Sequence, residues 1–126
     1  FQCVIPPESA KAGLTRLLEA TATAGPGSFL AVLKRLGPQS GPVSFPMDGY
    51  TLALDFPISQ RVLDLLDRLD SIVLDHGGRF YLAKDSRMTR ETLHRSDPRM
   101  GRFQEMRSKT GASTMFKSLQ SARLGL

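Results

Sequence analysis

The segment YTLALDFP, from Tyr50 to Pro57, alternates large apolar side chains with small or polar ones. Successive side chains of a β-strand point to opposite faces of a sheet. One face therefore carries the large apolar side chains: Tyr50, Leu52, Leu54 and Phe56. The other carries the small or polar side chains: Thr51, Ala53 and Asp55. The pattern predicts a strand that covers a hydrophobic core with its first face and leaves its second face open.

An amphipathic helix is predicted directly after this strand. Ser59 is suited to cap its N-terminus, and Gly77-Gly78 end it. Between them, apolar residues recur at three- and four-residue spacing: Val62, Leu65, Leu66, Leu69, Ile72 and Val73. Arg79–Ala83 predicts a further strand that ends on Lys84. A lysine in that place must be solvated, paired with a carboxylate or directed at a ligand.

The residues before Tyr50 supply the other half of the pattern. Residues 2–5 predict a strand, Pro6-Pro7 begins a helix that runs to about Ala24, and Ser28–Leu36 predicts a second strand. Residues 37–49, rich in proline and glycine, predict a loop that is mobile. The order βαββαβ predicts an α+β, ferredoxin-like fold, in which two helices cover one face of a four-stranded antiparallel sheet.

The last third of the chain differs from this pattern. Helices are predicted near Thr89–Arg95 and Arg99–Lys109, followed by a break at TGAS and a final segment that carries several apolar residues. We therefore divide the chain into a ferredoxin-like domain, residues 1–84, and a C-terminal helical extension, residues 85–126. Phe1 is not an initiator residue and already belongs to a strand-like run, so we expect a further N-terminal portion.

The open face of the predicted sheet is the candidate site. The strand at Ser28–Leu36 has two possible orientations, since both of its faces are apolar. We place Lys34 on the open face, because under the helices it would lose its hydration without an evident partner. Gln2 joins this face as a polar residue of the first strand. The side chains expected to converge there are Gln2, Lys34, Thr51, Ala53, Asp55 and, at the rim, Lys84.

Composition limits the class of protein. With 126 residues, 40% of them hydrophobic, the chain is long enough for one globular domain. No apolar run reaches the roughly 20 residues of a spanning helix, and no signal peptide is evident. We expect a soluble protein with no transmembrane segment, in the cytoplasm rather than secreted. The single cysteine, Cys3, is interpreted as a small buried hydrophobe, and no metal site is expected because His94 has no second histidine or cysteine near it.

The net charge of +5 is unevenly distributed. Residues 1–78 hold six basic and eight acidic side chains, whereas residues 79–126 hold eleven and four. Such an excess is compatible with a nucleic acid, an acidic surface, a phosphate-bearing ligand or a solvated face. No catalytic triad, Walker loop or GxGxxG motif occurs. The open face is thus better suited to form one wall of a pocket than a complete catalytic site.

Three segments carry a family resemblance over nearly the whole chain, in the right order and at similar spacing: SFLAVLKRLGP (28–38), SFPMDGYTLALDFP (44–57) and GGRFYLAKDSR (77–87). The chain resembles the C-terminal part of FAD-dependent sugar oxidoreductases of the vanillyl-alcohol oxidase superfamily. In that family a separate N-terminal domain holds FAD, and the ferredoxin-like domain lays its open face over the flavin ring. The resemblance implies an FAD-linked oxidoreductase that oxidises the CH–OH group of a sugar-like substrate by hydride transfer to flavin N5, with this chain inactive alone.

The resemblance also implies roles for individual residues. Lys84 matches a catalytic and cofactor-binding lysine beside flavin N1 and the C2 carbonyl, where a cation stabilises the charge gained with the hydride. Tyr81 matches a tyrosine of the same pocket, which contacts cofactor and substrate. Lys34 and Gln2 match substrate-side residues. Two further substrate-side positions differ from a related sequence: Thr51 replaces asparagine and Ala53 replaces cysteine. Leu36 replaces phenylalanine, so pocket size and polarity differ.

Two other functions are compatible with a ferredoxin-like fold. An RNA-binding module uses stacked aromatic residues on the open face, but its third strand carries a signature that GYTLALDF lacks. We therefore expect no nucleic acid as partner. A regulatory module would bind a small molecule in the absence of flavin. The resemblance favours the flavoenzyme, whose partners would be its own N-terminal FAD-binding domain and a sugar-like substrate.

Overall fold

The computed structural model describes residues 1–25, 27–39, 41 and 43–126. Its first elements are β1 (Gln2–Ile5), α1 (Pro7–Ala24), β2 (Leu30–Leu36), β3 (Gly49–Asp55), α2 (Gln60–Asp75) and β4 (Arg79–Phe80). After a 3₁₀ turn, η1 (Leu82–Lys84), come α3 (Arg90–Ser96), α4 (Met100–Lys109), α5 (Ala112–Met115) and α6 (Leu119–Leu124). The predicted βαββαβ order and the helical extension are both present.

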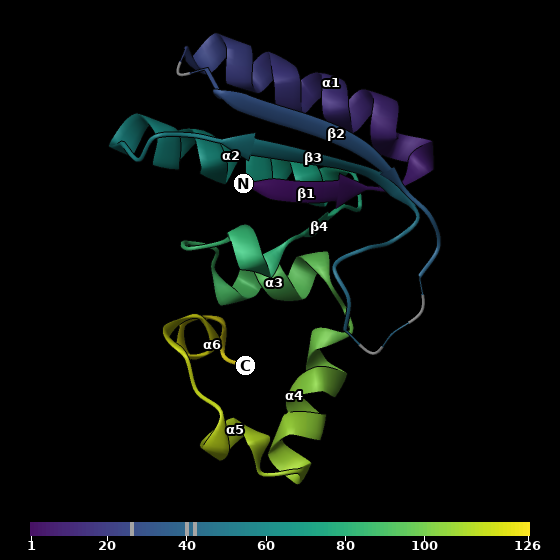
Figure 1. Cartoon of the computed structure of the whole chain (residues 1–126), viewed down its shortest axis with the longest axis vertical. Helices are drawn as coiled ribbons and strands as arrows, with labels where there is room; N and C mark the ends of the chain where they lie inside the picture. The colour runs from purple at the N-terminus through teal and green to yellow at the C-terminus, as the bar shows by residue number, and fades with distance from the viewer. Residues whose placement is uncertain (26, 40, 42) are drawn as a thin grey trace.

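The four strands form one antiparallel sheet in the order β2-β3-β1-β4. Figure 1 shows α1 and α2 together on one side of this sheet, with the C-terminal helices beyond the β4 edge. Pro7 stands in the first turn of α1, and the Ser59 hydroxyl accepts a hydrogen bond from the Val62 amide at the start of α2. The α+β, ferredoxin-like fold is confirmed.

The hydrophobic core lies between the sheet and the two helices. Leu52 and Leu54 of β3 point into it, as the alternation predicts, and pack with Leu17 of α1 and Leu69 of α2. Cys3 is fully buried in the same core, and burial raises the pKa of its thiol to about 12. The interpretation of this cysteine as a small buried hydrophobe is confirmed.

The strand predicted over Arg79–Ala83 is wrong beyond Phe80. In the described part of the chain β4 pairs with β1, and the last bond between them runs from the Tyr81 amide to the Gln2 carbonyl at 3.0 Å. Beyond this point the backbone bonds to itself in the 3₁₀ turn η1, and Leu82 packs against the core. Lys84 therefore lies on a 3₁₀ turn rather than at a strand end.

The C-terminal helices extend the core sideways. α3 packs against both β4 and α2, and buried side chains from three helices belong to the same core cluster: Leu93, Met100 and Leu124. Gly111, in the left-handed conformation with φ +72°, separates α4 from α5 at the predicted break. In the described ranges, no helix combines the length and the apolar character that crossing a membrane requires.

Gly49 allows β3 to approach β1 closely, which predicts a substitution effect. A Cβ on Gly49 would lie 3.0 Å from the Ile5 carbonyl carbon and closer still to its oxygen, so the strands would have to move apart. We expect Gly49→Ala to lower the free energy of unfolding by about 1 to 3 kcal/mol, measured by urea denaturation of the purified protein. Gly101→Ala in α4, where a Cβ meets open space, is the control and should cost nothing.

Candidate functional site

The open face of the sheet brings together the side chains that the sequence places there. In the strand register, Ala53 lies between Gln2 on β1 and Val32 on β2, and Thr51 lies opposite Lys34. Together with Lys84 from η1 these residues line a hollow of about 170 Å³. The orientation chosen for β2, with Lys34 on this face, agrees with the structure.

The polar groups of the hollow are partly organised by their own contacts. Gln2 Nε2 donates a hydrogen bond to Thr51 Oγ1 at 3.1 Å, and Thr51 is only 3% exposed. Lys84 Nζ lies 3.1 Å from Asp55 Oδ1, and each of these side chains is about one third exposed. In the described ranges, Lys34 has neither a hydrogen-bond nor an ion-pair partner. The face thus presents one paired and one free ammonium group on opposite sides of Ala53.

The position of Lys84 follows from the turn that carries it. The Lys84 amide donates to the Tyr81 carbonyl at 3.0 Å, and the Asp85 amide donates to the Leu82 carbonyl at 3.2 Å. These bonds turn the chain back across the end of β1, so that the Lys84 side chain reaches Asp55 on β3. Of the three explanations for a lysine here, pairing with a carboxylate is the one that the structure shows.

Tyr81, another residue expected at the site, does not line this hollow. Its ring packs against Phe45 in a tilted arrangement with a centroid distance of 4.8 Å, and 38% of the residue is exposed. It shares a smaller neighbouring hollow with Gln2 and Lys84. The structure therefore places Tyr81 beside the candidate site, at the β4 edge, and separates it from Lys34.

A cluster of charged residues next to Tyr81 was not foreseen from the sequence. Arg79 and Arg99 both donate to the Ser44 carbonyl, at 2.9 and 2.7 Å, and Arg99 reaches the Gly41 carbonyl at 3.3 Å. Asp97, only 3% exposed, lies 3.4 Å from Arg79 Nε and 2.7 Å from an Arg99 amino group. This cluster, called the loop clamp below, binds two carbonyl groups of the loop that precedes β3, those of Gly41 and Ser44.

One contact of the loop clamp, between Asp97 and Arg99, has a local signal in the sequence. Asp97 precedes Pro98, and its carboxylate accepts a bond from the Arg99 backbone amide at 3.1 Å, which is an Asx turn. The predicted mobility of residues 37–49 remains untested, and residues 40 and 42 lie outside the described ranges.

Opposing influences act on the carboxylate of the clamp. Burial alone raises the pKa of Asp97, but the bonds from Arg99 together with the charges of Arg79 and Arg99 outweigh it. The result is a pKa below the usual value for an aspartate. The Asp97 carboxylate is therefore ionised at neutral pH, where its attraction to Arg79 and Arg99 has its full strength.

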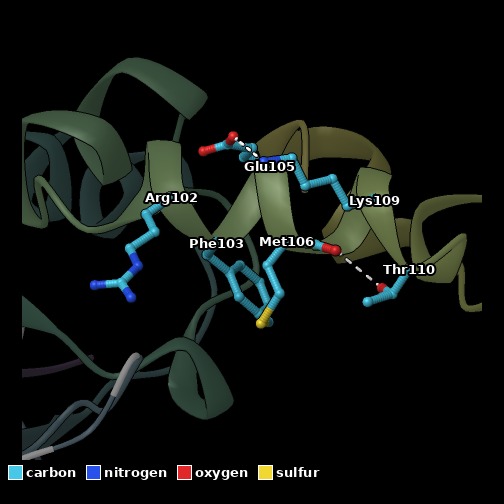
Figure 2. A pocket seen from close by; sticks show the side chains of 6 residues that line it. All are labelled: Arg102, Phe103, Glu105, Met106, Lys109 and Thr110. Atoms are coloured by element: carbon cyan, nitrogen blue, oxygen red, sulfur yellow. Dashed lines mark hydrogen bonds and ion pairs between the residues drawn. The ribbon is translucent and has the colours of Figure 1, made fainter.

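A second hollow, of about 410 Å³, lies on α4 and away from the sheet. Figure 2 shows Phe103 and Met106 side by side on one face of this helix, with Arg102 nearby. Glu105 forms an ion pair with Lys109 at 2.6 Å. This surface is mainly apolar and holds no nucleophile with a base beside it, so we assign no chemistry to it.

Two known proteins are similar in sequence to all or most of this chain. No protein-family model matches the chain. It is 39% identical over 115 residues to an uncharacterised protein encoded in the 5′ region of mprA in Streptomyces coelicolor, which covers 90% of the chain and 31% of that protein. It is 36% identical over 127 residues to decaprenylphosphoryl-β-D-ribose oxidase of Mycolicibacterium smegmatis. The chain thus spans less than a third of each relative, and its entire length is similar to 27% of a decaprenylphosphoryl-β-D-ribose oxidase.

Proposed function

We propose that this chain forms the substrate-side wall of the active site in an FAD-dependent oxidoreductase that oxidises an alcohol group of a sugar-like substrate. The similarity to an oxidase supports the oxidoreductase class. The observation that carries the proposal is the open face, where Gln2, Lys34 and Lys84 surround Ala53 in a chain with that similarity.

The residues of this face fit a flat aromatic ring. Val32, Ala53 and Leu30 form an apolar centre, and ammonium and amide groups stand around it. The hollow of about 170 Å³ is smaller than the roughly 300 Å³ at which ligand pockets begin. It is therefore suited to be one wall, to be completed by another surface.

Each polar group would have a separate task at such a wall. FAD, when bound, supplies a hydride acceptor at N5. Lys84, whose ammonium group pairs with Asp55, would hold positive charge at the edge of the ring. Lys34 and Gln2 can donate hydrogen bonds to substrate hydroxyl or phosphate oxygens. Asp55 is committed to Lys84, so we assign no general base within this chain.

The second wall would be an FAD-binding domain of the same protein, N-terminal to this chain. Large apolar side chains exposed in the C-terminal region support the presence of a covering partner. They are Met106, Met115, Phe116 and Leu119, with exposures of 45% to 93%. Others, such as Phe29, Leu33 and Ile58, are exposed on or near the sheet, so apolar surface that a partner could cover is present in more than one part of the chain.

The test uses the full-length protein that contains this chain. We expect it to be purified with a visible flavin absorption band, and we expect decaprenylphosphoryl-β-D-ribose or a simpler pentose alcohol to bleach that band under anaerobic conditions. A full-length protein that neither contains nor binds FAD would overturn the proposal. A flavoprotein that is reduced only by substrates without an alcohol group would overturn the proposed substrate class.

A further inference from the structure

The turn that carries Lys84 is held from outside the sheet by the last helix. Gln120 Nε2 on α6 donates to the carbonyl oxygens of Leu82 and Asp85, at 2.6 and 3.2 Å. These two residues stand immediately around Ala83 and Lys84. One side-chain amide, 38 positions away from Leu82 in the sequence, thus bonds to both ends of η1.

A second contact from α6 holds the residue after Lys84. An Arg123 amino group donates to Asp85 Oδ2 at 2.8 Å, and the other amino group bonds to the Met88 carbonyl. Asp85 Oδ1 accepts backbone bonds from Arg87 at 3.1 Å and Met88 at 2.8 Å. The Asp85 side chain is 9% exposed and every contact is internal, so this carboxylate serves the local backbone.

α6 is itself firmly attached, which allows it to act as a support. Leu124 is completely buried in the core, and Ser118 and Ser121 form a reciprocal capping box at the start of the helix. On the opposite side of the turn, Arg87 makes two bonds to Asp70 of α2, at 2.9 and 3.0 Å. The turn therefore lies between two anchored helices.

We propose that Gln120 and Arg123 are positioning residues for Lys84, and that α6 acts as a brace that fixes the ammonium group over the open face. This inference rests on the proposed function. Asp55 is the only partner of the Lys84 side chain in the described ranges, and both groups are about one third exposed. A pair so exposed contributes little to holding a geometry, so the backbone must set the position of Lys84.

The first test measures the turn itself. Gln120→Ala and Arg123→Gln in the full-length protein should speed amide hydrogen exchange about tenfold in a peptide covering residues 81–88. Arg95→Gln, which removes the same charge from an exposed position on α3, is the matched control and should leave that peptide unchanged. Unchanged exchange in both α6 variants would overturn the brace, whatever the protein catalyses.

The second test connects the brace to Lys84. In single-turnover reduction of bound flavin by substrate, each α6 variant should lower the rate about tenfold and leave substrate affinity unchanged. Combining Arg123→Gln with Lys84→Ala should give no loss beyond that of Lys84→Ala alone, because the brace acts through that side chain. Additive losses would overturn the positioning role. If Lys84→Ala itself has no effect while exchange still responds to the α6 variants, Lys84 takes no part in flavin reduction, the positioning role is overturned and the brace remains as a structural contact. The proposed function fails separately, if the full-length protein holds no flavin that a substrate reduces.

Discussion

Lys84→Ala in the full-length protein should slow the reduction of bound flavin by substrate about 100-fold while FAD stays bound. Removing one charged or hydrogen-bonding group that faces developing negative charge in an enclosed site typically costs that factor or more. The Lys84 ammonium group is the one that the turn directs across the end of β1, where it lies 3.1 Å from Asp55 Oδ1. Stopped-flow absorbance under anaerobic conditions measures the rate, and the flavin content of the purified variant measures retention.

Two control variants distinguish the effect of the positive charge at position 84 from the effect of removing any lysine. Lys84→Arg keeps the positive charge and should restore part of the rate. Lys11→Ala removes a lysine from an exposed position on α1 and should behave like the unmodified protein. A Lys84→Ala protein with normal reduction kinetics and normal flavin content would exclude this residue from the mechanism.

The open face could be predicted because it depends on local alternation. β3 shows its two faces directly in its sequence, and the desolvation cost of burying Lys34 settles the orientation of β2, on which apolar residues occupy both faces. The length of the last strand could not be predicted in this way. Residues 80–83 are apolar, but local pattern does not show whether their backbone bonds to β1 or to itself, and after Tyr81 it forms the 3₁₀ turn.

The contacts that hold the site together could not be predicted from the sequence, because they join distant segments. Arg99 reaches Ser44 across 55 positions, and Arg123 reaches Asp85 across 38. The last third of the chain holds many arginines but only two aspartates, Asp85 and Asp97, and no periodicity indicates which of them meet. The uneven charge of that region is therefore partly explained, because several of its basic side chains form ion pairs within the chain.

The loop clamp gives the largest expected effect on stability. Asp97→Ala should lower the free energy of unfolding by about 3 to 5 kcal/mol, because two arginines would lose the buried carboxylate between them. Urea denaturation at neutral pH measures the loss. Asp75→Ala is the matched control, since Asp75 pairs with Arg16 at 3.5 Å with both side chains about half exposed, and it should cost less than about 1 kcal/mol.

The stability lost in Asp97→Ala should depend on pH, and this dependence identifies the electrostatic part of the loss. The pKa of Asp97 is lower in the folded protein than in the unfolded chain, so its ionic contribution is fully present above the unfolded value of about 3.9 and is lost as the pH falls through the folded value. The stability difference between the unmodified protein and Asp97→Ala should therefore be constant from neutral pH to about pH 5 and should shrink below about pH 4. Asp70 and Asp85 titrate in both proteins, so their contributions cancel in the difference. A difference that stays constant at acid pH would show that Asp97 stabilises the loop by packing, and the clamp would lose its ionic character.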